Sequence, residues 1–211
     1  MKIKLYTHND LDGVGCAVLA KLAFKEEVII NYCNYDEIDD KIMEQLLYRG
    51  NKDVIFITDI SVSEEVAGEI ERISPKSTKL IDHHGTAAWL NKYNWARVVE
   101  KEYNEVEKRY QLTSGTSLFY EFLQEMGVLQ PTDALDDFTE TVRRYDSWEW
   151  KRELREKKKE ILRYNTKENF DHHFDSIYFK VERALLYSAT IIRILIESQK
   201  LSDDIDQYKI N

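Results

Sequence analysis

The 211-residue chain is acidic, with 30 Lys and Arg residues against 39 Asp and Glu residues and a formal net charge of −9. Proteins that bind long nucleic acid neutralise many phosphates, so this balance excludes general affinity for long duplexes and leaves room for a small phosphorylated ligand held by metal ions. Cys16 and Cys33 are too few for a disulfide framework or a zinc-type pair. The sequence opens on charged residues rather than a signal peptide and has no apolar run of membrane length, which predicts a cytoplasmic protein without a membrane partner.

Strands and helices alternate over the first hundred residues. Apolar runs typical of strands occupy residues 2–7, 28–35, 53–60, 78–84 and, more weakly, 96–99. Helical spacing of apolar residues covers residues 12–24, 37–50 and 63–73. Gly50 is a suitable helix end and Ser63 a suitable N-cap. Alternation of this kind predicts an α/β fold with a parallel sheet of about five strands flanked by helices.

The pattern becomes helical from about residue 113. Helices are predicted over residues 113–127, 132–150 and 175–201, with a charge-rich stretch at residues 151–164. The second of these helices begins with Thr132, after Pro131. We therefore expect a domain at residues 1–150 and a helical extension or linker at residues 151–211, whose final helix is a candidate for homodimer formation.

Histidine and aspartate residues follow three of the predicted strands. His8, Asp10 and Asp12 follow the first, Asp59 ends the third, and Asp82, His83 and His84 end the fourth. Ligands of parallel sheets bind beyond the carboxyl ends of the strands, so one rim collects all these side chains. His8, Asp10 and Asp12 also alternate, and alternate residues of an extended chain point to the same side.

These donor types suit Mn²⁺, Mg²⁺ or Fe²⁺ better than a thiolate-rich zinc site would. Acids packed together without a cation repel each other, so either a cation lies among them or the chain bends and separates them. Two neighbouring metal ions need a shared carboxylate and activate a water for attack on phosphorus. Asp59, which stands alone between the other two clusters in the sequence, is the natural bridge.

Each motif also has a structural alternative. Asp59 could cap the following helix, residues 8–12 could form an Asx-type turn, and residues 82–84 could be a surface loop. The triplet "DHH" recurs at Asp171, His172 and His173, where no apolar strand precedes it. We interpret this second copy as solvated surface.

Four segments together resemble the motifs of the DHH phosphoesterase family. They are "THNDLDG", "ITDIS", "IDHHG" and "RRYDSWEW", in that order, and they span about residues 3–150. This family includes RecJ-like exonucleases, nano-RNases, cyclic dinucleotide phosphodiesterases and, more distantly, manganese pyrophosphatases. The acid two residues after His8 resembles the short spacing of the RecJ-like branch, which disfavours pyrophosphatases and many nano-RNases. Residues 1–150 would then be the catalytic domain.

The resemblance implies two metal ions, Mn²⁺ with Mg²⁺ as a possible substitute. It implies one ion on His8, Asp10 and Asp59, and a second on Asp12, Asp59, His83 and Asp146. His84 would face the scissile phosphate, and Asp82 would orient a neighbouring histidine. The residues alone do not select Asp146 from the other downstream acids, and its assignment rests on the resemblance.

The implied activity is metal-dependent hydrolysis of phosphodiester or phosphomonoester bonds in short oligonucleotides, nucleotides or cyclic dinucleotides. Relatives usually carry a second domain with a glycine-rich substrate loop, and residues 151–211 do not resemble it. The alternatives are a catalytic domain of a RecJ-like single-strand exonuclease and a non-catalytic metal- or nucleotide-binding module. Trp148 and Trp150 are expected to pack in the core rather than stack on bases, and Lys157, Lys158 and Lys159 to lie on a solvated helix face.

Overall fold

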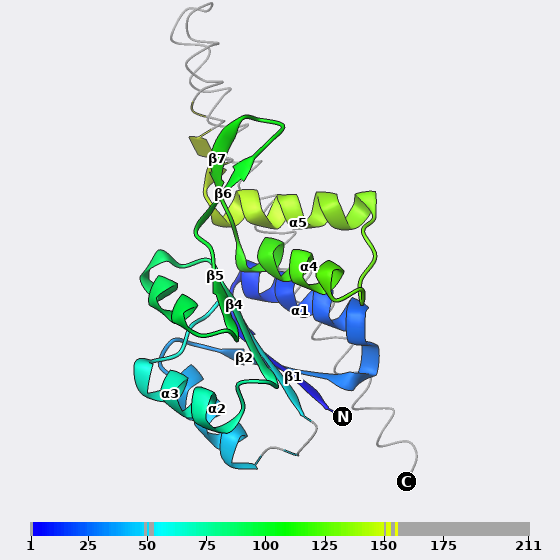
Figure 1. Cartoon of the computed structure of the whole chain (residues 1–211). Helices are drawn as coiled ribbons and strands as arrows, with labels where there is room; N and C mark the ends of the chain where they lie inside the picture. The colour runs from blue at the N-terminus through cyan, green and yellow to red at the C-terminus, as the bar shows by residue number, and fades with distance from the viewer. Residues whose placement is uncertain (1, 49, 51–52, 150, 153–154, 156–211) are drawn as a thin grey trace, which may run out of the picture. The chain divides into compact units, whose positions relative to one another are not determined.

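The computed structural model describes residues 2–48, 50, 53–149, 151–152 and 155 (Figure 1). The chain divides into two units at residues 147 and 148, and the elements named below belong to the first unit. Four predictions fall outside the described residues: the final helix at 175–201, the second "DHH" triplet, the lysine run at 157–159 and the environment of Trp150. The expectation that Trp148 packs in the core is wrong, because this residue is 62% exposed.

A five-stranded parallel sheet lies at the centre of the first unit. Its strands are β1 (Ile3–His8), β2 (Val28–Cys33), β3 (Val54–Thr58), β4 (Thr78–Asp82) and β5 (Ala96–Val98), in the order β2-β1-β3-β4-β5. All neighbouring pairs are parallel. The prediction of five strands in an α/β fold is therefore confirmed. In this order the chain reverses direction across the sheet between β1 and β3, which is where doubly wound sheets bind ligands.

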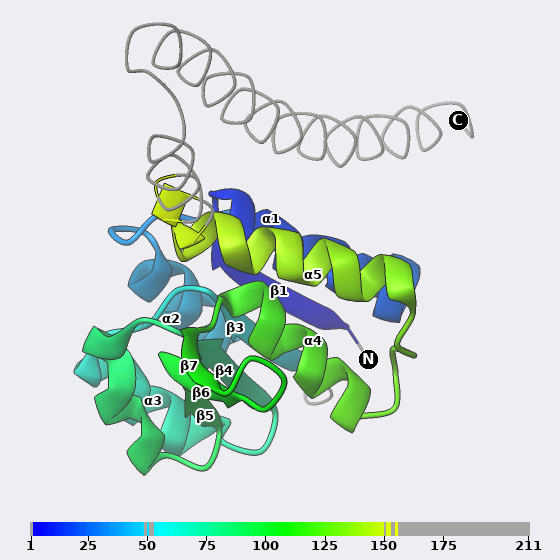
Figure 2. The same cartoon turned by 90° about the horizontal axis from the view of Figure 1, so that it is seen from above.

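Helices cover both faces of the sheet (Figure 1). They are α1 (Leu11–Phe24), α2 (Ile38–Tyr48), α3 (Glu64–Ile73), α4 (Gly115–Glu125) and α5 (Asp133–Asp146), with short 3₁₀ turns η1 (Lys25–Glu27) and η2 (Gly85–Lys92). Figure 1 shows α2 and α3 on one face and α1 and α4 on the other, and Figure 2 shows α5 packed over α1 and α4.

Two apolar clusters follow from this arrangement. On β3, Ile55 and Ile57 belong to the cluster under α2 and α3, whereas Phe56 between them belongs to the cluster under α1 and α4. Successive strand residues point to opposite faces, so a strand covered on both faces reads as one continuous apolar run. The two apolar clusters hold the sheet in place from both faces, and with it the polar residues at the carboxyl ends of its strands.

Caps at the helix starts agree with the sequence. The Ser63 side chain caps α3 by accepting a hydrogen bond from the backbone N–H of Val66, and Thr132 caps α5 in the same way. α2 ends at Tyr48, two residues before Gly50. Because Ser63 is the α3 cap, the alternative role of Asp59 as a helix cap is wrong.

A β-hairpin between β5 and α4 was not expected. Its strands are β6 (Lys101–Asn104) and β7 (Arg109–Leu112), which pair antiparallel. Each strand carries one tyrosine among mostly polar and charged residues, and Tyr103 packs against Tyr110 across the strands, with ring centroids 5.3 Å apart. The segment lacks the apolar run by which the five central strands are recognised.

Cys16 and Cys33 are buried free thiols, as their apolar surroundings suggest. Within the described part of the chain, no helix combines the length and the apolar character that crossing a bilayer requires.

Candidate metal centre

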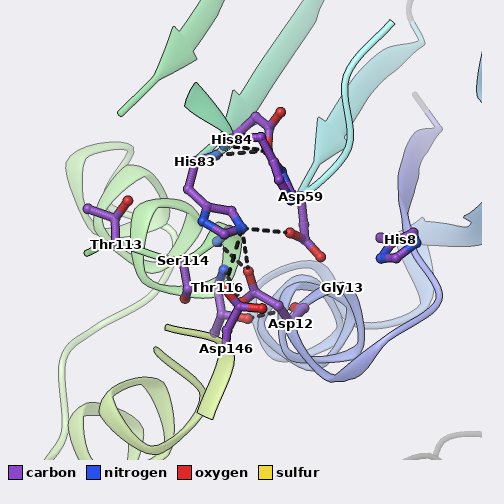
Figure 3. A network of polar contacts seen from close by, with 12 residues as sticks. His8, Asp12, Gly13, Asp59, His83, His84, Thr113, Ser114, Thr116 and Asp146 are labelled. Atoms are coloured by element: carbon purple, nitrogen blue, oxygen red, sulfur yellow. Dashed lines mark hydrogen bonds and ion pairs between the residues drawn. The ribbon is translucent and has the colours of Figure 1, made fainter. Parts of the chain in front are cut away.

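The carboxyl ends of β1, β3 and β4 bring the expected donors to one rim. His8 is the last residue of β1, Asp59 follows β3, and Asp82 is the last residue of β4, followed directly by His83 and His84. Asp10 and Asp12 lie at the start of α1, and Asp146 is the last residue of α5. Figure 3 shows Asp59 between His83 on one side and His8 on the other.

The chain bends sharply between β1 and α1. Asp10 is the N-cap of α1, and its carboxylate accepts a hydrogen bond from the backbone N–H of Gly13 at 3.0 Å. A side chain on residue 13 would overlap the carbonyl oxygen of His8, so only glycine permits this bend. The extended alternation of His8, Asp10 and Asp12 is therefore wrong in detail: the bend keeps the first two together and carries Asp12 into a different group of donors.

The first group consists of His8, Asp10 and Asp59, whose potential ligand atoms lie within 4.8 Å of one another. The Nδ1 atom of His8 is 2.8 Å from an oxygen of Asp10. Even so, this nitrogen and the Oδ2 atom of Asp59 are buried without a hydrogen-bond partner. Buried polar atoms normally have hydrogen-bond partners, so these two atoms indicate a site for a bound cation.

The second group consists of Asp12, His83 and Asp146, again within 4.8 Å. The Nε2 atom of His83 lies 3.5 Å from Asp12, 3.6 Å from Asp146 and 3.2 Å from Asp59. It too is buried without a hydrogen-bond partner. Asp59 thus belongs to the first group and also lies against His83 of the second group.

Asp59 has an unusual backbone and an unusual charge environment. Its φ angle is +57°, a conformation that non-glycine residues rarely adopt and that often marks functional sites. The side chain is 1% exposed. Burial, followed by the charges of Asp12 and Asp10, raises the pKa of Asp59 well above its ordinary value. A bound cation would offset the negative charges of Asp12 and Asp10 and stabilise the ionised form of the buried Asp59 carboxylate.

The start of α4 fixes Asp12. The backbone N–H groups of Gly115 and Thr116 donate to the two oxygens of the Asp12 carboxylate, the latter at 2.8 Å. The Thr116 hydroxyl also donates to the Asp12 carbonyl oxygen at 2.7 Å. A helix N-terminus attracts negative charge, and these three hydrogen bonds hold Asp12 in one orientation.

Asp82 has a different set of partners. One oxygen accepts hydrogen bonds from the backbone N–H of His83 at 2.8 Å and lies 2.8 Å from the Nδ1 atom of His84, and the other accepts from the Ser61 hydroxyl. Burial alone would raise the pKa of Asp82, but the bonds and charge of His84 and the Ser61 bond hold it below its ordinary value. Although Asp82 also lies near Asp59 and both histidines, its oxygens are already engaged. This arrangement suits a residue that orients His84 rather than a metal ligand.

The donors present fit a divalent metal ion. They are imidazoles and carboxylates, which suit Mn²⁺ or Mg²⁺, and the donor groups include neither of the two cysteines, both of which are thiols whose pKa burial raises. Burial and the charges of Asp12 and Asp10 also raise the pKa of Asp146 to about 7. The raised pKa values let Asp59 and Asp146 retain protons in the absence of a cation, whereas bound metal would ionise them.

Several residues of the rim escaped the sequence analysis. Ser61 lies inside a recognised motif and Thr116 inside a predicted helix, yet their contacts span long sequence distances and leave no local pattern. Gly115 makes a contact of this kind too, 103 residues from Asp12. The signal available in the sequence is the "TSGTS" run, which has the form of a helix start.

Known proteins share this fold and these motifs. Residues 2–142 match the family model described as "DHH family, N-terminal domain". The chain is 44% identical over 153 residues to Oligoribonuclease NrnB of Bacillus subtilis (strain 168), a match that covers 70% of this chain and 37% of that protein. It thus spans well under half the length of this curated relative.

A crystal structure of an uncharacterized protein from Helicobacter pylori G27 has a similar fold. Its TM-score is 0.55 at 22% sequence identity, over 70% of this chain and 44% of that one. The Bacillus relative corrects one inference, because a protein named an oligoribonuclease is similar to a chain whose first-motif spacing was taken to disfavour nano-RNases. The family model covers most of the chain, and the chain therefore belongs to the DHH family.

Proposed function

We propose that this chain is a metal-dependent phosphoesterase that hydrolyses phosphodiester bonds of short oligonucleotides. The observation that carries the proposal is the meeting of two donor groups at Asp59, beside a histidine that is held by a buried carboxylate. The name of the Bacillus relative supports oligoribonucleotides as the first substrates to test, ahead of nucleotides and cyclic dinucleotides.

The ligand sets follow from the two groups. His8, Asp10 and Asp59 would hold one ion, and Asp12, Asp59, His83 and Asp146 the other, which supports Asp59 as the shared ligand. When bound, such a pair of ions activates a water and neutralises charge on the phosphate. The imidazole and carboxylate donors favour Mn²⁺, with Mg²⁺ as the alternative.

His84 and Asp82 would act on the substrate side. The hydrogen bond that His84 donates to Asp82 raises the pKa of His84 more than burial lowers it, so the imidazole holds its proton more firmly than a free histidine. A protonated His84 would face the scissile phosphate and stabilise the charge that develops on its oxygens. The Ser61 hydroxyl donates a hydrogen bond to the other oxygen of Asp82 and would thereby keep the Asp82 carboxylate oriented toward His84.

The proposal extends to the organisation of the chain. We assign catalysis to residues 1–150 and treat residues 151–211 as an extension through which a homodimer would form. A cytoplasmic setting suits the two free thiols. Because the net charge of −9 disfavours binding of a long duplex, we expect a short substrate.

The test is hydrolysis of labelled ribonucleotides of two to five residues by the purified chain. We expect turnover with added Mn²⁺, turnover no better with Mg²⁺, and none in excess chelator. The control is Asp137→Asn, which changes an exposed acid of the helix that carries Asp146. Full activity in chelator would overturn the metal-dependent mechanism, and tight Mn²⁺ binding without any hydrolysis would favour the non-catalytic module.

A further inference from the structure

An exposed tyrosine stands beside the two donor groups. Tyr35 lies in the loop between β2 and α2, and its ring centroid is 4.7 Å from that of His8 and 6.4 Å from that of His84. It therefore neighbours one proposed metal ligand and the histidine proposed to face the phosphate. The residue is 62% exposed, so its ring does not serve the core.

The loop that carries this ring is held by hydrogen bonds. The backbone N–H and the side-chain amide of Asn34 donate to one carboxylate oxygen of Glu37, at 2.9 and 3.3 Å. The backbone N–H of Glu37 returns a bond to the Asn34 carbonyl at 3.0 Å. Tyr35 is enclosed within this short cycle, so its backbone is ordered before any ligand arrives.

A further bond ties this loop to the metal rim. The side-chain amide of Asn9 donates to the Asn34 side-chain oxygen at 2.7 Å. Asn9 lies between His8 and Asp10 in the chain, so the turn that carries two proposed ligands and the loop that carries Tyr35 are joined directly. These bonds hold the backbone of the loop against the turn that carries two proposed ligands.

The charge of the rim makes an uncharged contact useful. The groups around it are mostly carboxylates, and the chain as a whole carries −9, so phosphates away from the metal ions gain little from the protein. An aromatic ring holds a nucleobase by stacking, without needing opposite charge and without preferring one base. In a nucleotide, one sugar separates the base from its phosphate. The ring centroids of Tyr35 and His84 are 6.4 Å apart, so a base at Tyr35 and a phosphate at His84 could belong to the same nucleotide.

We propose that Tyr35 is a positioning residue on which the nucleobase next to the scissile phosphate stacks. The inference rests on the proposed function, since it assigns a place to one part of that substrate. His8 covers part of the ring, and the exposed remainder receives the base. The enzyme would then require a base beside the cleaved bond but discriminate little among the four.

The test compares Tyr35→Leu, which removes the ring, with Tyr35→Phe, which keeps it. The matched control is Tyr48→Leu, an 81% exposed tyrosine at the far end of α2. On a diribonucleotide with Mn²⁺, Tyr35→Leu should raise KM about 5- to 150-fold, the range that loss of one stacked base predicts, and change kcat much less. Tyr35→Phe and Tyr48→Leu should stay within about twofold of the parent, and a dinucleotide lacking the neighbouring base should erase the difference between parent and Tyr35→Leu.

A second measurement separates this inference from the proposed function. A dinucleotide containing 2-aminopurine is titrated with the Mn²⁺-loaded parent, because stacking quenches its fluorescence. Hydrolysis with an unchanged KM in Tyr35→Leu would overturn the stacking inference and leave the function standing. Quenching that depends on Tyr35 without hydrolysis would support stacking and overturn the function. Absence of both hydrolysis and quenching would overturn both.

Discussion

The backbone of Gly115 lies against Asp59 so closely that a Cβ atom on residue 115 would stand 2.5 Å from the Asp59 Cβ. The same Gly115 N–H donates to Asp12. One residue at the start of α4 thus contacts both Asp59, which follows β3, and Asp12, which lies in the first turn of α1. The rim thus depends on a helix that begins 103 residues after Asp12 and 56 residues (115 − 59) after Asp59.

The first prediction concerns this contact. Gly115→Ala should displace Asp59 or Asp12 and reduce Mn²⁺ affinity and hydrolysis by at least about tenfold, the lower range for residues that orient metal ligands. The control is Gly68→Ala in α3, where an added Cβ meets nothing within 4 Å. That change should stabilise the fold by roughly 0.5–1 kcal/mol, because alanine is the better helix former. Wild-type Mn²⁺ affinity in Gly115→Ala, measured by titration calorimetry, would contradict the close-contact argument.

The second prediction separates the two "DHH" copies. Asp59→Asn should lower kcat/KM by more than about a hundredfold, since a shared ligand affects both ions and even the groups that orient ligands cost about 10- to 100-fold. His172→Ala and His173→Ala should remain near the parent, because the second copy is interpreted as solvated surface. A His173→Ala protein as inactive as Asp59→Asn would show that the wrong copy was chosen. Steady-state kinetics on one diribonucleotide decides the matter.

The third prediction concerns stability without metal. The pKa of Asp146 in the folded protein is raised to about 7, and that of Asp59 is raised well above its ordinary value. A carboxyl whose folded pKa exceeds its unfolded pKa binds more protons when folded, so its contribution is present at low pH and is lost as the pH rises through the folded pKa. In excess chelator, this contribution to the free energy of unfolding should therefore fall between about pH 4 and pH 7.

Urea unfolding of the parent and Asp146→Asn isolates this effect. The variant has no titrating carboxyl at residue 146, so its metal-free stability should decline less steeply over that range. Mn²⁺ should stabilise the parent more at pH 7.5 than at pH 5.5, because the metal competes with protons for the same oxygens. Equal pH slopes for parent and variant would mean that Asp146 is not protonated in the metal-free fold.

Much of the rim was predictable because it depends on short local patterns. Apolar runs mark the strands, and Asp59 and His83 follow two of those runs directly, so the parallel-sheet rule brings them to one edge. Which donors fall into which of the two groups was not predictable in the same way. It depends on the bend at Asp10 and on the contact between Asp12 and α4, which joins residues about a hundred positions apart.

Two other features had no signal of their own. Asp146 ends a helix that carries several acids, so only the resemblance of residues 143–150 to a family motif assigned it, and the structure brings it 3.6 Å from His83. Tyr35 reads as one more aromatic residue in the run that forms β2, and only its position past the strand end and beside His8 makes it a candidate for substrate contact. Both depend on packing between elements, which the periodicity of one element does not encode.

The last prediction concerns substrate length. The net charge of −9 repels a polyanion beyond the reach of the metal ions, and stacking at Tyr35 would hold only one base. Ribonucleotides of two to five residues should therefore have a higher kcat/KM per molecule than a single strand of a few dozen nucleotides, at fixed Mn²⁺. Added salt screens the repulsion, so the disadvantage of the long strand should narrow as ionic strength rises. Efficient, processive degradation of long single strands by residues 1–211 alone would contradict this and would favour the exonuclease alternative, with the basic stretch from Lys151 to Lys167 as the first region to mutate in search of the strand's path.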